Sequence, residues 1–353
     1  MSFLERAWRR SSPWLYLLWP LSLVFRALAA LRRRRGRARA RGAAAAPVIV
    51  IGNISVGGTG KTSLLIALAI ELRRCGFSPG VISRGYGATA GEFPKAVGAD
   101  SDPFACGDEP VLIAASTGCP VVIDPDRGRA LAHLLRHGGV DLALSDDGLQ
   151  HYALHRDIEI AVVDGAAMFG NGLCLPAGPL REPPRRLGEV DMVVVNGAAD
   201  ASGATLDLPV PRFRVEMAPK GFVNLRSGAE KPFTGAPFQL GDTLQLVCGI
   251  GNPERFFQLM RRLPYPLTRI EFPDHHRFRP EDFADPRLDP RQPIVMTGKD
   301  AVKCRAFAPA NCWELRAEME LPEEFVDHLL RRLAEIQPGF AAEPETQAEA
   351  ERG

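Results

Sequence analysis

The sequence predicts an α/β protein, a mostly parallel sheet with helices on both faces, followed by a second, smaller α/β lobe. Two observations support this. Short apolar runs rich in Val and Ile alternate with helical stretches from about residue 47 to residue 200, and a strand–loop–helix unit begins again near residue 244. We divide the chain into an N-terminal segment, a first domain, a linker with the smaller lobe, and a disordered tail, at 1–46, 47–210, 211–340 and 341–353.

The N-terminal segment is apolar and then strongly basic. Residues 14–31 are mostly apolar, and four arginines follow at 32–35. A signal peptide carries its basic residues before the apolar run. A transmembrane helix needs about 20 apolar residues, and this run is slightly shorter and contains Pro20 and Arg26. We therefore predict an anchor helix lying in the membrane interface, with its arginines on anionic headgroups. Two alternatives stay open: a single span with cytoplasmic arginines, and a helix packed on the protein body before a disordered basic linker.

Charge and cysteine content narrow the possible partners. Of 43 basic and 42 acidic residues, eleven arginines and one glutamate lie in residues 1–42, so a basic end precedes an acidic body. We expect an anionic membrane surface as partner, no nucleic acid, and infer no obligate protein partner. The seven cysteines are scattered without a CxxC pair, which fits neither a zinc site nor a disulfide framework. They are predicted to be small buried hydrophobes in a reducing compartment.

The first domain is predicted from periodicity. Helices are expected at 61–74, ended by Gly76, and at 127–136. Buried strands are expected at 48–51, 81–83, 120–123, 142–145, 158–163 and 192–196.

The linker and the smaller lobe follow. Residues 213–217 and 222–225 predict a β-hairpin linker around Pro219-Lys220-Gly221. The smaller lobe is then built from a strand at 244–249, a helix at 253–262, a strand at 294–297 and a closing amphipathic helix at 323–336.

The strongest chemical signal is the glycine-rich loop after the first predicted strand: Ser55-Val56-Gly57-Gly58-Thr59-Gly60-Lys61-Thr62. Glycines let backbone N–H groups approach a triphosphate, and the following helix N-terminus favours its negative charge. Lys61 is expected to reach the β- and γ-phosphates, and the Thr62 hydroxyl to bind Mg²⁺. Ser55 departs from the usual glycine at the first position. The alternative, a coincidental glycine-rich turn, does not account for the strand before the loop and the helix after it. The fold is thus predicted to be of the P-loop NTPase type.

Two further motifs carry carboxylates. Asp146 and Asp147 end the strand at 142–145, where a P-loop enzyme needs an acidic ligand for Mg²⁺, directly or through water. Adjacent acids also cap helices or form turns, and the sequence does not say which of the two leads in metal binding. Asp108 and Glu109 begin a helical stretch before Pro110, where an N-cap is the common alternative. We assign Glu109 to the metal ligands as well.

A third cluster is Asp274-His275-His276, far downstream. Phosphoryl transfer to an alcohol needs a carboxylate or imidazole near the attacking hydroxyl. If the small lobe folds against the P-loop, an Asp–His pair spanning the cleft would serve. A polar loop, or a metal-ligand pair without partners, are the alternatives, and spacing alone does not decide.

These residues together resemble the tetraacyldisaccharide 4'-kinase family. Besides the apolar–basic N-terminal helix, the matching segments are Gly52-Asn53-Ile54 with residues 55–62, SRGYG at 83–87, GDEP at 107–110, DDGLQH at 146–151, LPAGPLRE at 175–182, Asp274-His275 and TGKDAVK at 297–303. The resemblance covers roughly residues 10–335. Ser at the first P-loop position is usual in this family, so the departure at Ser55 loses its force.

The resemblance implies a kinase that uses ATP and Mg²⁺ to phosphorylate the 4'-hydroxyl of the lipid A disaccharide precursor, at the cytoplasmic face of the inner membrane. It implies that Asp108 and His275 form the base unit, supported by Asp274. It also places Arg181 and Gly178 at the disaccharide, with Arg84 and Asn171 as further substrate candidates. Acyl-chain preference, oligomeric state and the geometry of the closed cleft stay open.

Two rival functions remain at this stage. One is a membrane-associated P-loop ATPase switch that drives a protein partner, and the other is a kinase for a soluble acceptor. An ATPase assay with and without a detergent-dispersed disaccharide lipid separates them.

Overall fold

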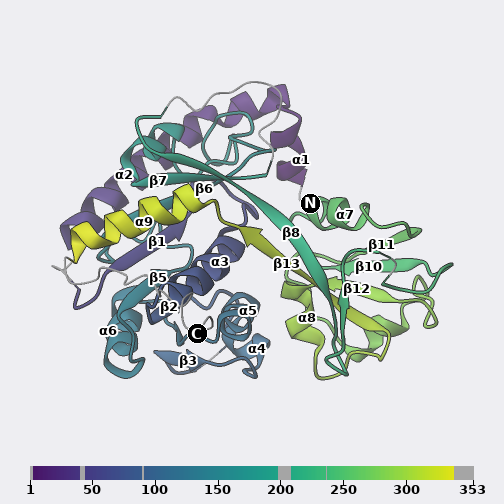
Figure 1. Ribbon diagram of the computed structural model, residues 1–353. Helices are drawn as coiled ribbons and strands as arrows, with labels where there is room; N and C mark the ends of the chain where they lie inside the picture. The colour runs from purple at the N-terminus through teal and green to yellow at the C-terminus, as the bar shows by residue number, and fades with distance from the viewer. Residues whose placement is uncertain (1–2, 40–43, 90, 198–207, 236, 338–353) are drawn as a thin grey trace, which may run out of the picture.

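The computed structural model describes residues 3–39, 44–89, 91–197, 208–235 and 237–337. The predicted disordered tail, 341–353, lies outside the described residues. Two lobes are joined by long strands, and an N-terminal helical arm lies along the larger lobe (Figure 1).

The larger lobe is a parallel sheet with helices on both faces, as predicted. Its strands are β1 (Val48–Gly52), β2 (Pro79–Ser83), β4 (Val121–Ile123), β5 (Leu142–Ser145), β6 (Ile158–Asp164) and β7 (Met192–Asn196), with β3 (Lys95–Val97) antiparallel at the edge. Side chains alternate along β1: Ile49 and Ile51 join one core, Val48 and Val50 the other. Because both faces are buried, the strand is a continuous apolar run rather than an alternating one.

The helices of this lobe divide between the two cores. One face is covered by α3 (Lys61–Arg74) and α5 (Asp108–Thr117), and the other by α6 (Arg127–His137). Short α4 (Pro103–Cys106) precedes α5, and the 3₁₀ helix η2 (Pro184–Glu189) precedes β7. Six of the seven cysteines are buried and the seventh is half-buried, and all are free thiols, which confirms their prediction as small apolar residues.

The smaller lobe has its own parallel strands and two cores. These strands are β10 (Leu244–Cys248), β11 (Leu267–Glu271) and β12 (Ile294–Thr297), and the helices are α7 (Glu254–Met260), α8 (Gly298–Cys304) and the 3₁₀ helix η3 (Pro280–Ala284). One core lies under α7 and the other near α8.

The linker differs from the predicted hairpin. Residues 213–217 and 222–225 belong to one strand, β8 (Arg212–Asn224), which pairs with β7 in the larger lobe and with β13 (Cys312–Glu320) toward the smaller one. Pro219-Lys220-Gly221 does not turn the chain. The register shifts opposite it, between Arg316 and Ala317, so an extra residue is absorbed as a bulge and the strand bends. The hairpin partner of β8 is β9 (Glu230–Pro232) instead.

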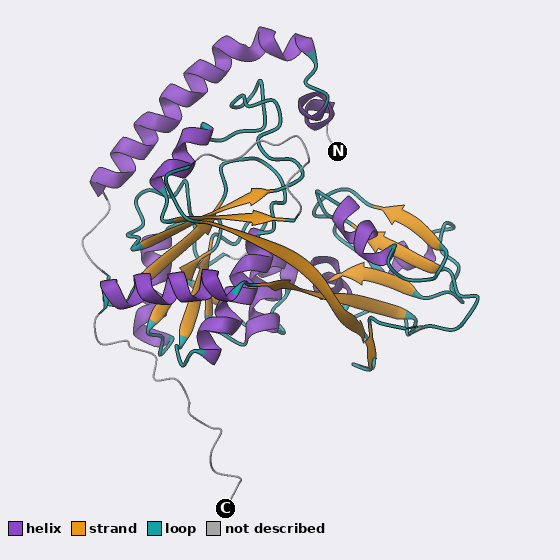
Figure 2. Cartoon of the chain, turned by 45° about the horizontal axis from the view of Figure 1, so that its top comes forward, coloured by secondary structure: helices purple, strands orange, loops and turns teal. Residues whose placement is uncertain are grey.

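One helix of the predicted smaller lobe lies elsewhere. The helix at 323–336 forms as expected, as α9 (Glu323–Ile336), but Phe325, Leu329 and Leu333 pack in the core of the larger lobe beneath its sheet. The chain therefore crosses between the lobes twice, along β8 and back along β13 (Figure 2). These strands form one sheet in the order β11-β10-β12-β13-β8-β7-β6-β1-β5-β2-β4-β3, and β9 pairs with β8 outside this path.

The N-terminal arm consists of α1 (Phe3–Arg9), the 3₁₀ helix η1 (Pro13–Leu18) and α2 (Trp19–Arg39). Pro20 lies in the first turn of α2, where proline is tolerated because its missing N–H would have no partner there, so it does not break the helix. By length and composition, Pro13–Arg39 could cross a membrane.

Candidate active site

A single cavity of about 2720 Å³ lies between the two lobes and is bounded on one side by the N-terminal arm. Every residue of the P-loop (residues 55–62) lines it, together with Asp146, Asp147, Asp274 and His275. Pockets for one small ligand are typically about 300–1,000 Å³, so this cavity has room for two substrates.

The shape of the P-loop depends on a glycine at position 60 and on two side chains that bond to Thr59. Gly60 caps α3 with a φ of 94°, and a Cβ at that position would lie 2.2 Å from Asn196 Nδ2. Asn196 Nδ2 donates to the carbonyl of Thr59 at 2.9 Å, while Asn53 Nδ2 donates to its hydroxyl at 3.2 Å. Only glycine fits beside Asn196 at this positive φ, and Gly57, Gly58 and Gly60 line the cavity.

The two adjacent acids have different surroundings. Asp147 forms ion pairs with Lys61 at 3.5 Å and Arg181 at 3.3 Å. Burial by itself would raise the pKa of Asp147, but these cations outweigh it and lower that pKa. Asp146 is buried, and burial, followed by the charges of Glu109 and Asp147, raises its pKa to about 7. Among the residues that the structure describes, Asp146 Oδ1 has no hydrogen-bond partner, whereas Asp147 Oδ1 has its ion pair with Lys61.

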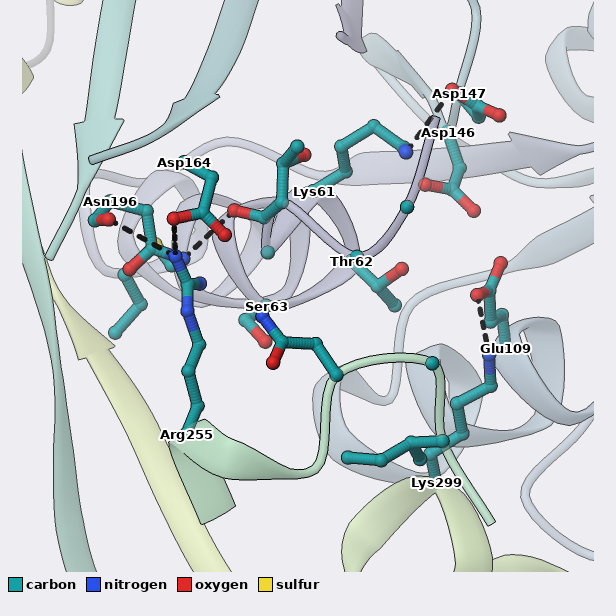
Figure 3. A pocket seen from close by; sticks show the side chains of 18 of the residues that line it. Lys61, Thr62, Ser63, Glu109, Asp146, Asp147, Asp164, Asn196, Arg255 and Lys299 are labelled. Carbon is teal, nitrogen blue, oxygen red and sulfur yellow. Dashed lines mark hydrogen bonds and ion pairs between the residues drawn. The ribbon is translucent and has the colours of Figure 1, made fainter. Parts of the chain in front are cut away.

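Asp146 therefore fits a cation, because a buried carboxylate oxygen without a donor is costly unless a positive charge meets it. Thr62 and Glu109 line the same cavity, on the side where Asp146 lies (Figure 3). Among the residues that the structure describes, no three His, Cys, Asp or Glu side chains are gathered closely enough to hold a metal alone. Mg²⁺ usually keeps waters and substrate phosphates among its ligands, so one or two carboxylates suffice.

Asp108 and His275, 167 positions apart, meet across the lobes. His275 Nδ1 lies 3.3 Å from Asp108 Oδ2, which begins α5. The hydrogen bond to Asp108 raises the pKa of His275. Burial would raise the pKa of Asp108, but the His275 hydrogen bond and the charges of Lys299 and Lys303 lower it overall. Asp108 is thus kept ionised beside the imidazole.

The other members of the downstream cluster have separate roles. Asp274 Oδ1 accepts from the backbone N–H of His275 at 3.0 Å and lies 4.0 Å from His275 Nε2. It supports a residue whose φ is 57°, an uncommon value outside glycine. His276 points away: its Nε2 lies 2.9 Å from Asp282 and its ring stacks on Phe272. The tandem histidines are therefore not a metal-ligand pair.

Comparisons with known proteins agree over nearly the whole chain. A family model described as tetraacyldisaccharide-1-P 4'-kinase matches residues 14–334. The chain belongs to this family. A relative named tetraacyldisaccharide 4'-kinase from Stutzerimonas stutzeri is 45% identical over 340 residues, 96% of this chain and 98% of its own. Another of that name, from Pseudomonas aeruginosa strain LESB58, is 42% identical over 344 residues, 94% of this chain and 100% of its own.

The fold agrees as well. A crystal structure titled as the "apo" form of LpxK from Aquifex aeolicus in complex with ATP superposes with a TM-score of 0.73 at 24% identity. The match covers 90% of this chain and 99% of that one.

In this member of the tetraacyldisaccharide 4'-kinase family, the four residues that we expected at the disaccharide fall into two groups. Arg181 and Arg84 line the cavity. Gly178 and Asn171 are not among its lining residues: Asn171 Nδ2 donates to the Ala177 carbonyl at 2.8 Å, and a Cβ on Gly178 would lie 2.2 Å from Asn171 Oδ1. These two residues build the loop that presents Arg181.

Several cavity residues were missed by the sequence analysis. Lys299 Nζ pairs with Glu109 at 3.0 Å and lies 3.9 Å from Asp108, joining the lobes. Across the cavity, Arg255 of α7 reaches Asp164 at 2.8 Å and the Asn196 carbonyl at 3.2 Å (Figure 3). Asp164 and Asn196 could have been predicted, because each is a polar residue at the carboxyl end of an apolar parallel strand, where ligands bind in such sheets. Nothing in the sequence marks Arg255.

Proposed function

We propose that this chain transfers the γ-phosphoryl group of ATP to the 4'-hydroxyl of a tetraacylated glucosamine disaccharide 1-phosphate, giving lipid IVA in lipid A biosynthesis. Membership of the tetraacyldisaccharide 4'-kinase family over residues 14–334 carries this proposal. It is supported by a P-loop and His275 lining one cavity, with His275 paired across the lobes to Asp108.

The P-loop side binds the nucleotide. Residues 55–62 offer backbone N–H groups and a helix N-terminus to the phosphates, and Lys61 neutralises charge on the transferred group. Thr62, Asp146 and Glu109 would hold Mg²⁺, which neutralises charge on the β- and γ-phosphate oxygens when bound. Asp146 is the leading carboxylate, because Asp147 is already paired with Lys61 and Arg181.

The small-lobe side activates the acceptor. Asp108 accepts the Nδ1–H of His275, which leaves Nε2 to take the proton of the attacking 4'-hydroxyl. The sugar oxygen forms its bond to the γ-phosphorus as the bond to ADP breaks, and the proton stays on His275. Asp108 stabilises the imidazolium so formed, and Asp274 fixes the backbone that presents the ring. Arg181 and Arg84 would meet anionic or hydroxyl groups of the disaccharide.

The N-terminal arm suits an anionic lipid surface at the cytoplasmic face of the inner membrane. Its outward side exposes large apolar side chains, which are 47–81% exposed: Tyr16, Leu17, Trp19, Leu21 and Val24. Exposed arginines follow at the far end of α2. An apolar face beside a cationic one matches acyl chains beside anionic headgroups. A bilayer-rooted acceptor is reached faster from the same surface.

The test is an ATP-turnover assay on the full chain, with and without detergent-dispersed tetraacyl disaccharide 1-phosphate. A kinase of this acceptor forms ADP and the 4'-phosphate in equal amounts, and only when the lipid is present. ADP formed at the same rate without lipid would favour an ATPase switch. Phosphorylation of a soluble, deacylated disaccharide at the same kcat/KM would show that the acyl chains are not recognised.

A further inference from the structure

The N-terminal arm makes a second kind of contact, on its inward side. Ser22 is 2% exposed in a helix whose other face is open. Its hydroxyl donates to the Cys174 carbonyl at 2.8 Å and accepts from the Ala177 N–H at 3.1 Å. Trp8 Nε1 donates to the Pro176 carbonyl at 3.0 Å. Two side chains of the arm thus bond three backbone groups of one short loop.

That loop, residues 173–181, which we call the bridging loop, is bonded to the P-loop at its other end. The Val56 N–H donates to the Pro179 carbonyl at 2.8 Å, and the Arg181 N–H donates to the Ile54 carbonyl at 2.7 Å. Ser55 and Leu180 form an isolated β-bridge. The start of the P-loop therefore shares its hydrogen bonds with a segment that the arm holds.

The bridging loop also sets the position of Arg181. The Arg181 guanidinium reaches Asp147 Oδ2 at 3.3 Å and Gln150 Oε1 at 3.4 Å. Gln150 Nε2 donates to Glu182 at 2.9 Å, and Glu182 is buried. A shift of the loop would move Arg181 relative to Asp147. Asp147 also pairs with Lys61, so the shift would change the surroundings of the P-loop lysine.

We propose that Ser22 and Trp8 are positioning residues of the active site: through the bridging loop they hold Arg181 and residues 54–56, where the P-loop begins, in place. The arm is then more than a tether, since the hydrogen bonds of the bridging loop connect the helix that contacts the membrane to the phosphate-binding loop. The catalytic part of this inference rests on the proposed kinase function, whereas its nucleotide-binding part does not.

The test uses the full chain in detergent micelles, with Ser22→Ala and Trp8→Phe. Trp8→Phe removes the N–H donor and part of the ring volume, but it keeps an aromatic ring in the small core that Trp8 forms with Ala7 and Leu15. Ala30→Ser, at an exposed position of α2 that does not line the cavity, is the control. Binding of a non-hydrolysable ATP analogue with Mg²⁺ is measured by calorimetry, so the readout needs no lipid acceptor.

We expect Ser22→Ala to weaken analogue binding about three- to tenfold and Trp8→Phe about threefold, the size expected for lost neutral hydrogen bonds. Ala30→Ser should leave analogue binding unchanged. Hydrogen exchange should rise in Ser22→Ala at residues 173–181 and also at 54–56, which reports local opening transmitted to the P-loop. In the lipid assay kcat should fall about tenfold, with vesicle binding unchanged.

Wild-type analogue affinity in both variants, with exchange raised at 173–178 alone, would overturn the inference and leave these contacts a purely stabilising role. If analogue affinity and exchange at 54–56 change as expected while the wild type phosphorylates no lipid, the proposed function fails and the positioning role stands.

Discussion

The two sides of the cavity are assembled in different ways. On the P-loop side, residues 55–62 are contiguous, and Asp146 and Asp147 follow the neighbouring strand β5, so one sheet edge collects them. On the small-lobe side, His275, Lys299 and Arg255 come from three separate segments and meet the larger lobe only through side chains. Nucleotide binding is therefore built into one lobe, whereas acceptor activation depends on how the two lobes meet.

This difference predicts where substitutions act. Removing P-loop groups should abolish turnover. Removing the Asp108–His275 pair should lower the rate of the chemical step while leaving nucleotide binding largely intact, whereas Arg255, which meets the larger lobe at the ends of β6 and β7, should affect only the KM for MgATP.

The largest effect is expected for Lys61→Ala. Because Lys61 neutralises charge on the transferred phosphate, turnover should fall at least ~10³-fold while the fold is kept. Turnover and thermal unfolding are measured together, with Lys95→Ala, on the edge strand β3, as control. Near-normal turnover would remove the phosphate-binding assignment.

Next come Asp108→Asn and His275→Ala. Each should lower kcat on the order of 10²–10⁴-fold, as expected for lost general-base help, with little change in KM for MgATP. The double variant should be hardly worse than the poorer single one, because residues acting as a unit are non-additive. The alternative is a helix cap and a loop residue with additive losses, about 1 kcal/mol of stability for the cap. His276→Ala, outside the pair, is the control.

The pH dependence sharpens the same comparison. His275 must be neutral to accept a proton, and Asp108 raises its pKa, so kcat should fall as pH drops through that raised pKa. In Asp108→Asn the largest cause of the shift is gone, so the acidic limb should move to lower pH even though the rate is lower throughout. If the acidic limb of the kcat profile stays at the same pH in Asp108→Asn, the limb reports the titration of a group other than His275.

The smallest effect is expected at the far side of the cavity. Arg255→Ala removes the ion pair to Asp164, a bridge between α7 and the end of β6. A partly exposed pair contributes at most about 1 kcal/mol, so KM for MgATP should rise about three- to fivefold with kcat nearly unchanged. Arg261→Ala, which removes an exposed pair to Glu254 on the same helix, should change neither constant. Equal effects of the two variants would show that Arg255 does not join the lobes.

Much of this protein was determined by its sequence alone. The strand at 142–145 and the helices at 61–74 and 323–336 form with the predicted ends, because each depends on local periodicity and on a nearby glycine, proline or acid. The P-loop was predictable for the same reason: its glycines, its lysine and the helix N-terminus lie within eight residues.

Tertiary structure decided the rest. Pro219-Lys220-Gly221 looks like a turn, but pairing with β13 keeps β8 extended and absorbs the extra residue as a bulge. The amphipathic pattern of α9 predicts that one side of the helix is buried, but not which lobe it packs against. The contact of Asp108 with His275, and that of Ser22 with the bridging loop, join residues more than 150 positions apart. Sequence spacing carries no information about such pairs, because only the packing of the lobes and of the arm brings them within hydrogen-bond distance.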